Sequence, residues 1–198
     1  MSILRVLASL LLLVLSLSVT AQRPTGTLPE KVVGQLRASG FHASDLTDLV
    51  VNDNYRSTRS GITHTYFRQR WQGIEVWNGD IAVHQAANGE VIKVNIGAFT
   101  AIEKRVNSTQ PSLSPENALA AVLARTTPGK ATPALVSSDA GEHTFVYDGT
   151  AFGHEPVIVK LVYQPVGDRL LLAWNVNHYT TDGLHWWNIR VDAMTGAE

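Results

Sequence analysis

The sequence contains no cysteine among its 198 residues. Disulfide frameworks, thiolate zinc sites and thiol nucleophiles are therefore excluded for these residues. The sequence also lacks an excess of charge of either sign, because it has 16 Lys and Arg residues and 17 Asp and Glu residues. Since nucleic-acid binding needs a surplus of basic residues, this balance argues against a nucleic-acid partner. The composition, 44% hydrophobic and 17% charged, is that of a globular chain with one ordinary domain or two small ones.

Complete catalytic motifs are lacking as well. His154-Glu155 begins a His-Glu-x-x-His zinc motif, but position 158 is isoleucine, and Pro156 is incompatible with the helix that the motif requires. Gly129-Lys130 lacks the other glycine and the Ser or Thr of a phosphate loop. The sequence therefore predicts no catalytic residue, no metal ligand and no cofactor-binding residue.

The remaining titratable residues are scattered. None of the other histidines forms a compact pair with a carboxylate at the usual metal-ligand spacings, so we expect them to be solvated or structural. We likewise expect the carboxylates to lie on wet faces and turns, namely Asp45, Asp48, Asp53 and Glu75.

One long apolar run occurs, at the N-terminus. Arg5 precedes the run Val6 to Val19, and small residues follow as far as Ala21. This pattern is typical of a secretory signal peptide cleaved between Ala21 and Gln22. The alternative is a membrane anchor, but the run is shorter than the roughly 20 residues that a spanning helix needs. We predict that residues 1–21 are a signal peptide, that the product is secreted or periplasmic, and that it has no membrane contact after cleavage.

The first part of the mature chain has a helix-then-strand pattern. Leu28 to Ser39 has apolar residues at helical spacing. From Asp48 to Ile96, β-branched and aromatic residues predict a meander of antiparallel strands. The apolar positions change parity within this segment, which predicts a β-bulge near Asn78 and Gly79. Two tight-turn pairs punctuate the strands, Gln72-Gly73 and Asn88-Gly89.

The second part repeats this pattern. Ser114 as a cap and Pro115 at the first helical position predict a helix that ends by Thr127. Four strands are predicted after it, over Thr144–Tyr147, Pro156–Tyr163, Leu170–Asn177 and Trp186–Asp192. The fold class is therefore α+β, with two antiparallel meanders that each pack against a helix.

These patterns divide the mature chain into segments. We expect a helical lead over 22–44, a first module over 45–102, a linker over 103–112 and a second module over 113–198. The pattern leaves open whether the modules share one sheet or form two lobes.

Aromatic residues are concentrated in both strand-rich segments, and we expect most of them to be buried. Trp186 and Trp187 are neighbours on a predicted strand, so their side chains point to opposite faces. At least one of them is then available on a surface that a partner could cover.

A run of residues between Gly61 and Phe99 has a recognisable pattern. Its main features are His64, Tyr66, Phe67, Gln69, Gly73, Ile74, Val76 and Asn78. This run resembles the propeptide domain shared by fungalysin and thermolysin-type metallopeptidases. Residues 113–198 resemble a PepSY-type segment, the second module of such propeptides. The resemblance implies cystatin-like and PepSY-like halves, and it is closer to the fungalysin branch of extracellular metallopeptidases.

The resemblance implies a function that residue patterns alone do not reveal. Such a region would assist folding of a zinc protease domain and inhibit it until proteolytic removal. The implied partner is the cognate catalytic domain, in cis or in trans, and zinc is expected only in that domain, which the 198 residues lack. We expect the contact surface on the aromatic strands of the second module and its C-terminal edge, at Trp174, Trp186, Trp187 and Asp192.

Three alternatives stay open. The chain could be a free-standing inhibitor and chaperone that acts in trans. It could instead be a secreted module that binds another protein, or the start of an active peptidase whose catalytic residues lie beyond the supplied sequence.

Overall fold

A computed structural model describes residues 23–153 and 155–198. The predicted signal peptide and its cleavage site at Ala21 and Gln22 lie outside these residues. None of the helices in the described part of the chain is long and apolar enough to cross a membrane.

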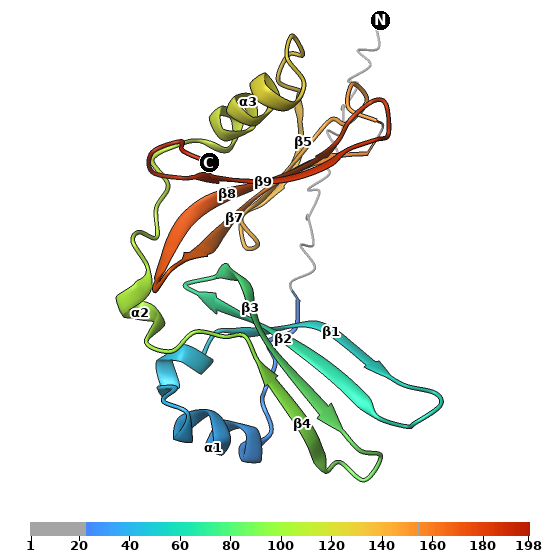
Figure 1. Cartoon of the computed structure of the whole chain (residues 1–198), viewed down its shortest axis with the longest axis vertical. Coiled ribbons are helices and arrows are strands. Elements are labelled where there is room, and N and C mark those ends of the chain that lie inside the picture. The colour runs from blue at the N-terminus through green and yellow to red at the C-terminus, as the bar shows by residue number, and fades with distance from the viewer. Residues whose placement is uncertain (1–22, 154) are drawn as a thin grey trace, which may run out of the picture.

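The first half consists of helix α1, the short 3-10 helix η1 and a four-stranded meander (Figure 1). The bounds are α1 Glu30–Ala38, η1 Ala43–Leu46, β1 Leu49–Arg56, β2 Thr63–Trp71, β3 Ile74–Gln85 and β4 Val91–Ile96. The helix predicted from the apolar spacing is confirmed, since α1 buries Val32 and Leu36 against Phe67, Ile81 and Val83 of the strands.

The second half, as far as the structure describes it, has two helices and five strands. The bounds are α2 Ile102–Arg105, α3 Pro115–Thr126, β5 Leu135–Asp139, β6 Thr144–Tyr147, β7 Val157–Val166, β8 Arg169–Tyr179 and β9 Trp186–Asp192. The predicted start of α3 is confirmed, because the backbone N–H of Asn117 donates to Oγ of Ser114 at 3.2 Å. α3 buries Leu119 and Leu123 in a core that includes Leu161 and Trp174 of the strands beneath.

The two halves form one nine-stranded mixed sheet, which answers the question that the sequence left open. β3 pairs with β7 in parallel, where Glu75 and Val76 lie opposite Val162 and Tyr163. This contact departs from the purely antiparallel pairing predicted. In Figure 1, α1 and α3 cover the outer faces of the two halves, and the helix-free faces turn toward each other.

The predicted linker over 103–112 is not a free connection. α2 buries Ile102 completely at the start of this segment. Val106 forms a parallel bridge with Leu170, and Oδ1 of Asn107 accepts a hydrogen bond from the backbone N–H of Leu172 at 2.8 Å. The polar composition of the segment concealed these contacts, because each partner lies more than 60 residues away in sequence.

The predicted bulge in β3 is confirmed and is larger than one residue. Arg68 pairs with Asp80 and Arg70 pairs with Glu75. One residue therefore separates the pairs on β2, whereas four separate them on β3, which leaves three extra residues in β3. Asn78 lies in this bulge with a φ of 58°, in the left-handed region that asparagine tolerates better than most residues.

Candidate functional site

The residues that carry the family resemblance divide between the two faces of the first half. His64 and Tyr66 of β2 are half-buried on the helix-free face. Phe67 and Gln69 are buried on the face that α1 covers. The alternation of side chains along a strand accounts for this division.

Gln69 holds three segments of the first half together. Its Nε2 donates to the backbone carbonyls of Asp45 and Phe99, each at 2.9 Å, and its Oε1 accepts the N–H of Phe99 at 2.8 Å. The carboxylate of Asp45 in turn accepts the N–H groups of Ala101 and Ile102. Asp45 is only 1% exposed, so its expected place on a wet face is wrong.

The other motif residues shape the junction between the halves. Gly73 has a φ of 82° in the turn between β2 and β3, and its N–H donates to Oδ2 of Asp48 at 2.9 Å. Ile74 and Val76 enter the core shared with α3, and Asn78 lies in the bulge. Six of the eight motif residues, from Phe67 to Asn78, therefore build the fold, whereas His64 and Tyr66 lie half-buried on the helix-free face.

A network of ion pairs lies where the two helix-free faces meet. Glu75 of β3 is 6% exposed, so the expectation that it lies on a wet face is also wrong. Its carboxylate contacts Arg23, contacts Nζ of Lys160 on β7 at 2.9 Å and contacts Nη1 of Arg68 at 3.5 Å. A single carboxylate thus joins the N-terminal segment and both halves.

Glu142, in the turn between β5 and β6, extends the network. Its carboxylate contacts Arg23 and lies 3.2 Å from Nζ of Lys160 and 3.8 Å from Nη1 of Arg70. Burial alone would raise the pKa of Glu142, but the hydrogen bonds from Arg23 and Lys160 outweigh it and lower the pKa. Burial lowers the pKa of Lys160. Because each carboxylate of this network lies against cations, we assign the network a structural role.

The four residues predicted as a protease contact are not equivalent. Trp174 is buried in the core, where its Nε1–H donates to the carbonyl of Leu113 at 2.8 Å, so it is not available to a partner. Oδ1 of Asp192 accepts the N–H groups of Met194 and Thr195 and so stabilises the turn after β9.

Trp186 and Trp187 lie at the beginning of β9. Trp186 is 59% exposed and stacks on Tyr179, with 6.1 Å between the ring centroids. Leu184, in the preceding loop, is 77% exposed. Trp187 is half-buried and stacks on His185. We call Tyr179, Leu184 and Trp186 the β9 patch.

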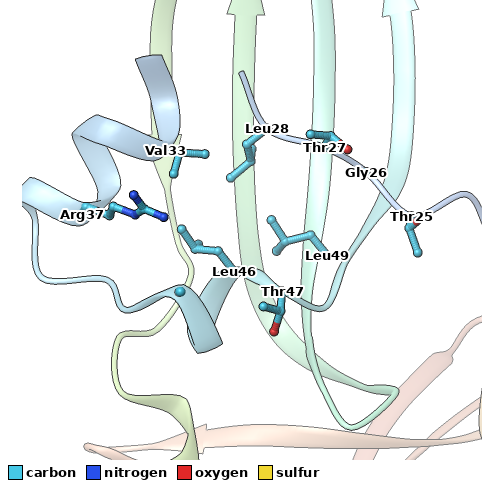
Figure 2. Close-up of a pocket in the computed structure, with 10 residues that line it drawn as sticks. Thr25, Gly26, Thr27, Leu28, Val33, Arg37, Leu46, Thr47 and Leu49 are labelled. Carbon is cyan, nitrogen blue, oxygen red and sulfur yellow. The ribbon is translucent and has the colours of Figure 1, made fainter. Parts of the chain in front are cut away.

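The described chain offers little that resembles a catalytic pocket. A pocket of about 520 Å³ lies between α1, η1, β1 and the segment Thr25–Leu28 (Figure 2). Its lining is apolar and hydroxyl side chains, with Arg37 as its one charged residue. Within residues 23–153 and 155–198, no three His, Asp or Glu side chains come together to hold a metal ion.

Comparison with protein families decides what the motif is. Residues 47–96 match the family described as the Fungalysin/Thermolysin Propeptide Motif. The chain carries a fungalysin/thermolysin propeptide motif. All eight motif residues, from His64 to Asn78, lie inside the match, so the resemblance noted in the sequence is confirmed. The propeptide motif spans β1 to β4, and the PepSY-like character of the second half stays a prediction.

Similarity to known proteins extends beyond the propeptide motif. The chain is 33% identical over 148 residues to extracellular metalloproteinase 3 of Trichophyton equinum and 34% identical to that of Arthroderma gypseum. It is 32% identical over 157 residues to extracellular metalloproteinase 10 of Uncinocarpus reesii. These alignments cover 73–76% of this chain but 23–24% of each relative. The chain thus spans about a quarter of the length of the relatives it matches.

Proposed function

We propose that this chain is the propeptide region of a secreted fungalysin-type zinc metalloendopeptidase. In this role it assists folding of the catalytic domain and inhibits it, either in cis or as a separate chain in trans. The observation that carries the proposal is the propeptide motif together with similarity to extracellular metalloproteinases over three quarters of the chain. That similarity also supports secretion.

The β9 patch is the surface that we propose for contact with the catalytic domain. Its three large apolar side chains are exposed, two of them stacked on each other, and burial of such side chains stabilises protein interfaces. Among the described strands, β9 pairs with β8 alone, so the part of its other edge before Asp192 can pair with a strand of the partner. At Asp192 the outward N–H and C=O are bonded to Ala197 and Gly196. Trp187 follows Trp186 on β9, so its half-buried side chain points to the opposite face of the sheet. Trp174 and Asp192, placed here by the sequence, support β9 from the core and from the following turn.

A preformed partner surface explains both activities physically. A chain that binds the native-like catalytic domain and not its unfolded state shifts the folding equilibrium by mass action. The same contact excludes substrate where it covers the cleft. No metal ligand in this chain is needed for either effect, and zinc would be held by the catalytic domain.

The test uses the metalloproteinase of Trichophyton equinum, expressed without the segment that matches this chain. Purified chain in micromolar excess is added to the active enzyme and, separately, to denatured enzyme during refolding. We expect at least tenfold slower peptide cleavage and a higher yield of enzyme after the chain is removed. Unchanged cleavage and unchanged yield together would overturn the proposal.

A pair of variants locates the contact. Trp186→Ser removes the most exposed aromatic side chain of the β9 patch and should weaken inhibition at least tenfold. Ile92→Ser removes a similarly exposed apolar side chain, 56% exposed, from β4. Equal inhibition by the two variants would place the contact surface elsewhere on the molecule.

A further inference from the structure

Two histidines that no functional assignment uses lie side by side on the helix-free face of the first half. His64 of β2 is the direct cross-strand partner of His84 of β3. Their Nδ1 atoms are 2.7 Å apart. Both residues are half-buried, so water and small ions reach them. Both strands have neighbours on either side, β1 and β4, so the backbone beneath the pair is held in place.

The spacing of the rings is close to that of a chelating pair. The ring centroids are 4.8 Å apart, and at most one proton can lie between the two Nδ1 atoms. A metal ion bound to two imidazoles at 2.0–2.1 Å sets the nitrogens roughly 3.3 Å apart in tetrahedral geometry. Small changes in the side-chain torsions open the pair by the roughly half an ångström required.

Neighbouring groups restrict the two rings. Nδ2 of Asn95 on β4 lies 3.2 Å from Nε2 of His84. When this amide flips, its oxygen takes the same place and accepts the Nε2–H of an Nδ1-bound ring, the kind of contact that orients histidine ligands. Tyr55 stacks on His64, with 4.9 Å between the ring centroids, and limits its rotation.

We propose that His64 and His84 form a cross-strand binding site for one divalent transition-metal ion that prefers imidazole ligands, Cu²⁺ before Zn²⁺. Water completes the coordination sphere, because the described residues offer no third His, Asp or Glu ligand at this point. Bound metal would link β2 to β3 four residues away from the pair Arg68–Asp80, where the bulge begins. The site is independent of the proposed protease contact, which lies on the other half.

The surrounding charges determine when the ion binds. Lys93 of β4 is the cross-strand partner of His84. Burial of the ring, the neighbouring His64 and the charge of Lys93 all lower the pKa of His84. Asp53 on β1 is the nearby acidic group, and Tyr55 and Tyr66 are the other titratable neighbours. The lowered pKa of His84 favours the neutral ring, which is the form that binds a metal. Protons compete with the ion as the pH falls.

The test is a titration of the purified chain with CuCl2 and with ZnCl2 at pH 7.4. We expect one ion per chain, tighter binding of Cu²⁺ than of Zn²⁺, and at least tenfold weaker binding at pH 5.5. The electron paramagnetic resonance spectrum of the Cu²⁺ complex should show two coordinated nitrogens. His64→Gln and His84→Gln should each weaken binding at least tenfold, whereas His42→Gln, an exposed histidine on another element, should not.

A second measurement needs no variant. In the unaltered chain labelled with ¹⁵N-histidine, Zn²⁺ should shift the resonances of two imidazoles together and leave the others in place. A spectrum with one coordinated nitrogen, or equal binding by His84→Gln and His42→Gln, would show that the pair is only a hydrogen-bonded contact. Zn²⁺ shifts spread over all histidines would show the same.

Discussion

Two buried polar side chains connect segments of this molecule that are distant in sequence. Gln69 and Asp45 are both essentially inaccessible, and each binds backbone groups of the segment after β4. A buried polar group is costly unless it is hydrogen-bonded, and here the partners are supplied in full. These two residues fix the path of the chain as it leaves the propeptide motif.

Gln69→Leu tests this role at a nearly constant side-chain volume. The variant loses three hydrogen bonds and leaves the N–H and C=O of Phe99 without this partner in a closed environment. We expect the free energy of unfolding to fall by about 3 kcal/mol, measured by urea denaturation. Gln35→Leu, at an exposed position of α1, is the control and should change it by less than about 0.5 kcal/mol. Equal effects would mean that the Gln69 contacts add no stability.

Sequence patterns could not identify these residues, because residue type predicts exposure only on average. Asp45 and Glu75 were expected in water, as most carboxylates are. Their burial depends on partners such as Ile102 and Lys160, which lie 57 and 85 positions away. The family resemblance includes Gln69 but gives no physical reason for its presence.

At the scale of elements, the bulge of β3 controls which residues face each other. The turn pairs Trp71 with Ile74, and the same register continued would place His64 opposite Ile81. Three extra residues in β3 place His64 opposite His84 instead. The change of parity revealed that a bulge exists, but not its size. The histidine pair was therefore beyond prediction from sequence.

Strands and helices themselves were predicted well where turn residues bound them. β6 and β9 have the bounds expected from the sequence, and α3 starts at Pro115. The exposed edge strand β5, Leu135–Asp139, was not predicted. Its five residues lack the alternation of apolar and polar side chains that indicates a half-buried strand. Local patterns thus specify the elements whose own side chains are buried.

Gly79→Ala tests how tightly the bulge is packed. An added Cβ would lie 2.8 Å from Cβ of Val76 and 3.2 Å from its carbonyl oxygen. We expect a loss of about 1–3 kcal/mol in thermal or urea unfolding. The matched control is Gly34→Ala in α1, where nothing lies within 4 Å and alanine favours the helix. That variant should gain up to about 1 kcal/mol. A neutral Gly79→Ala would mean that the bulge rearranges freely.

For the whole molecule, few backbone contacts hold the halves in one sheet. The parallel pairing of β3 with β7 involves two residues on each strand. Side chains supplement it, since Arg190 of β9 lies over the ring of Trp77, 4.4 Å from its centroid. No local pattern specifies so short a pairing between residues 87 positions apart, which is why sequence reasoning could not choose between one sheet and two lobes.

The ion pair between Glu75 and Lys160 spans this junction, and a double-mutant cycle measures its strength. Glu75→Gln alone leaves Arg23, Arg68 and Lys160 without their shared carboxylate, so it should be strongly destabilising. Lys160→Met removes one cation. Because both charged groups are largely buried, the two changes should be less costly together than their sum, with a coupling free energy of about 1–3 kcal/mol.

The same cycle on Arg125 and Glu198 provides the reference. The side chain of Arg125 is 67% exposed, so water and salt screen this pair, and its coupling should stay below about 0.5 kcal/mol. If the Glu75–Lys160 coupling were no larger, the network would contribute nothing specific to the junction, and apolar packing of Ile74 and Val76 would be what joins the halves. A larger coupling that survives 0.5 M NaCl would show that the junction is held by buried charge, since salt screens buried pairs much less than exposed ones.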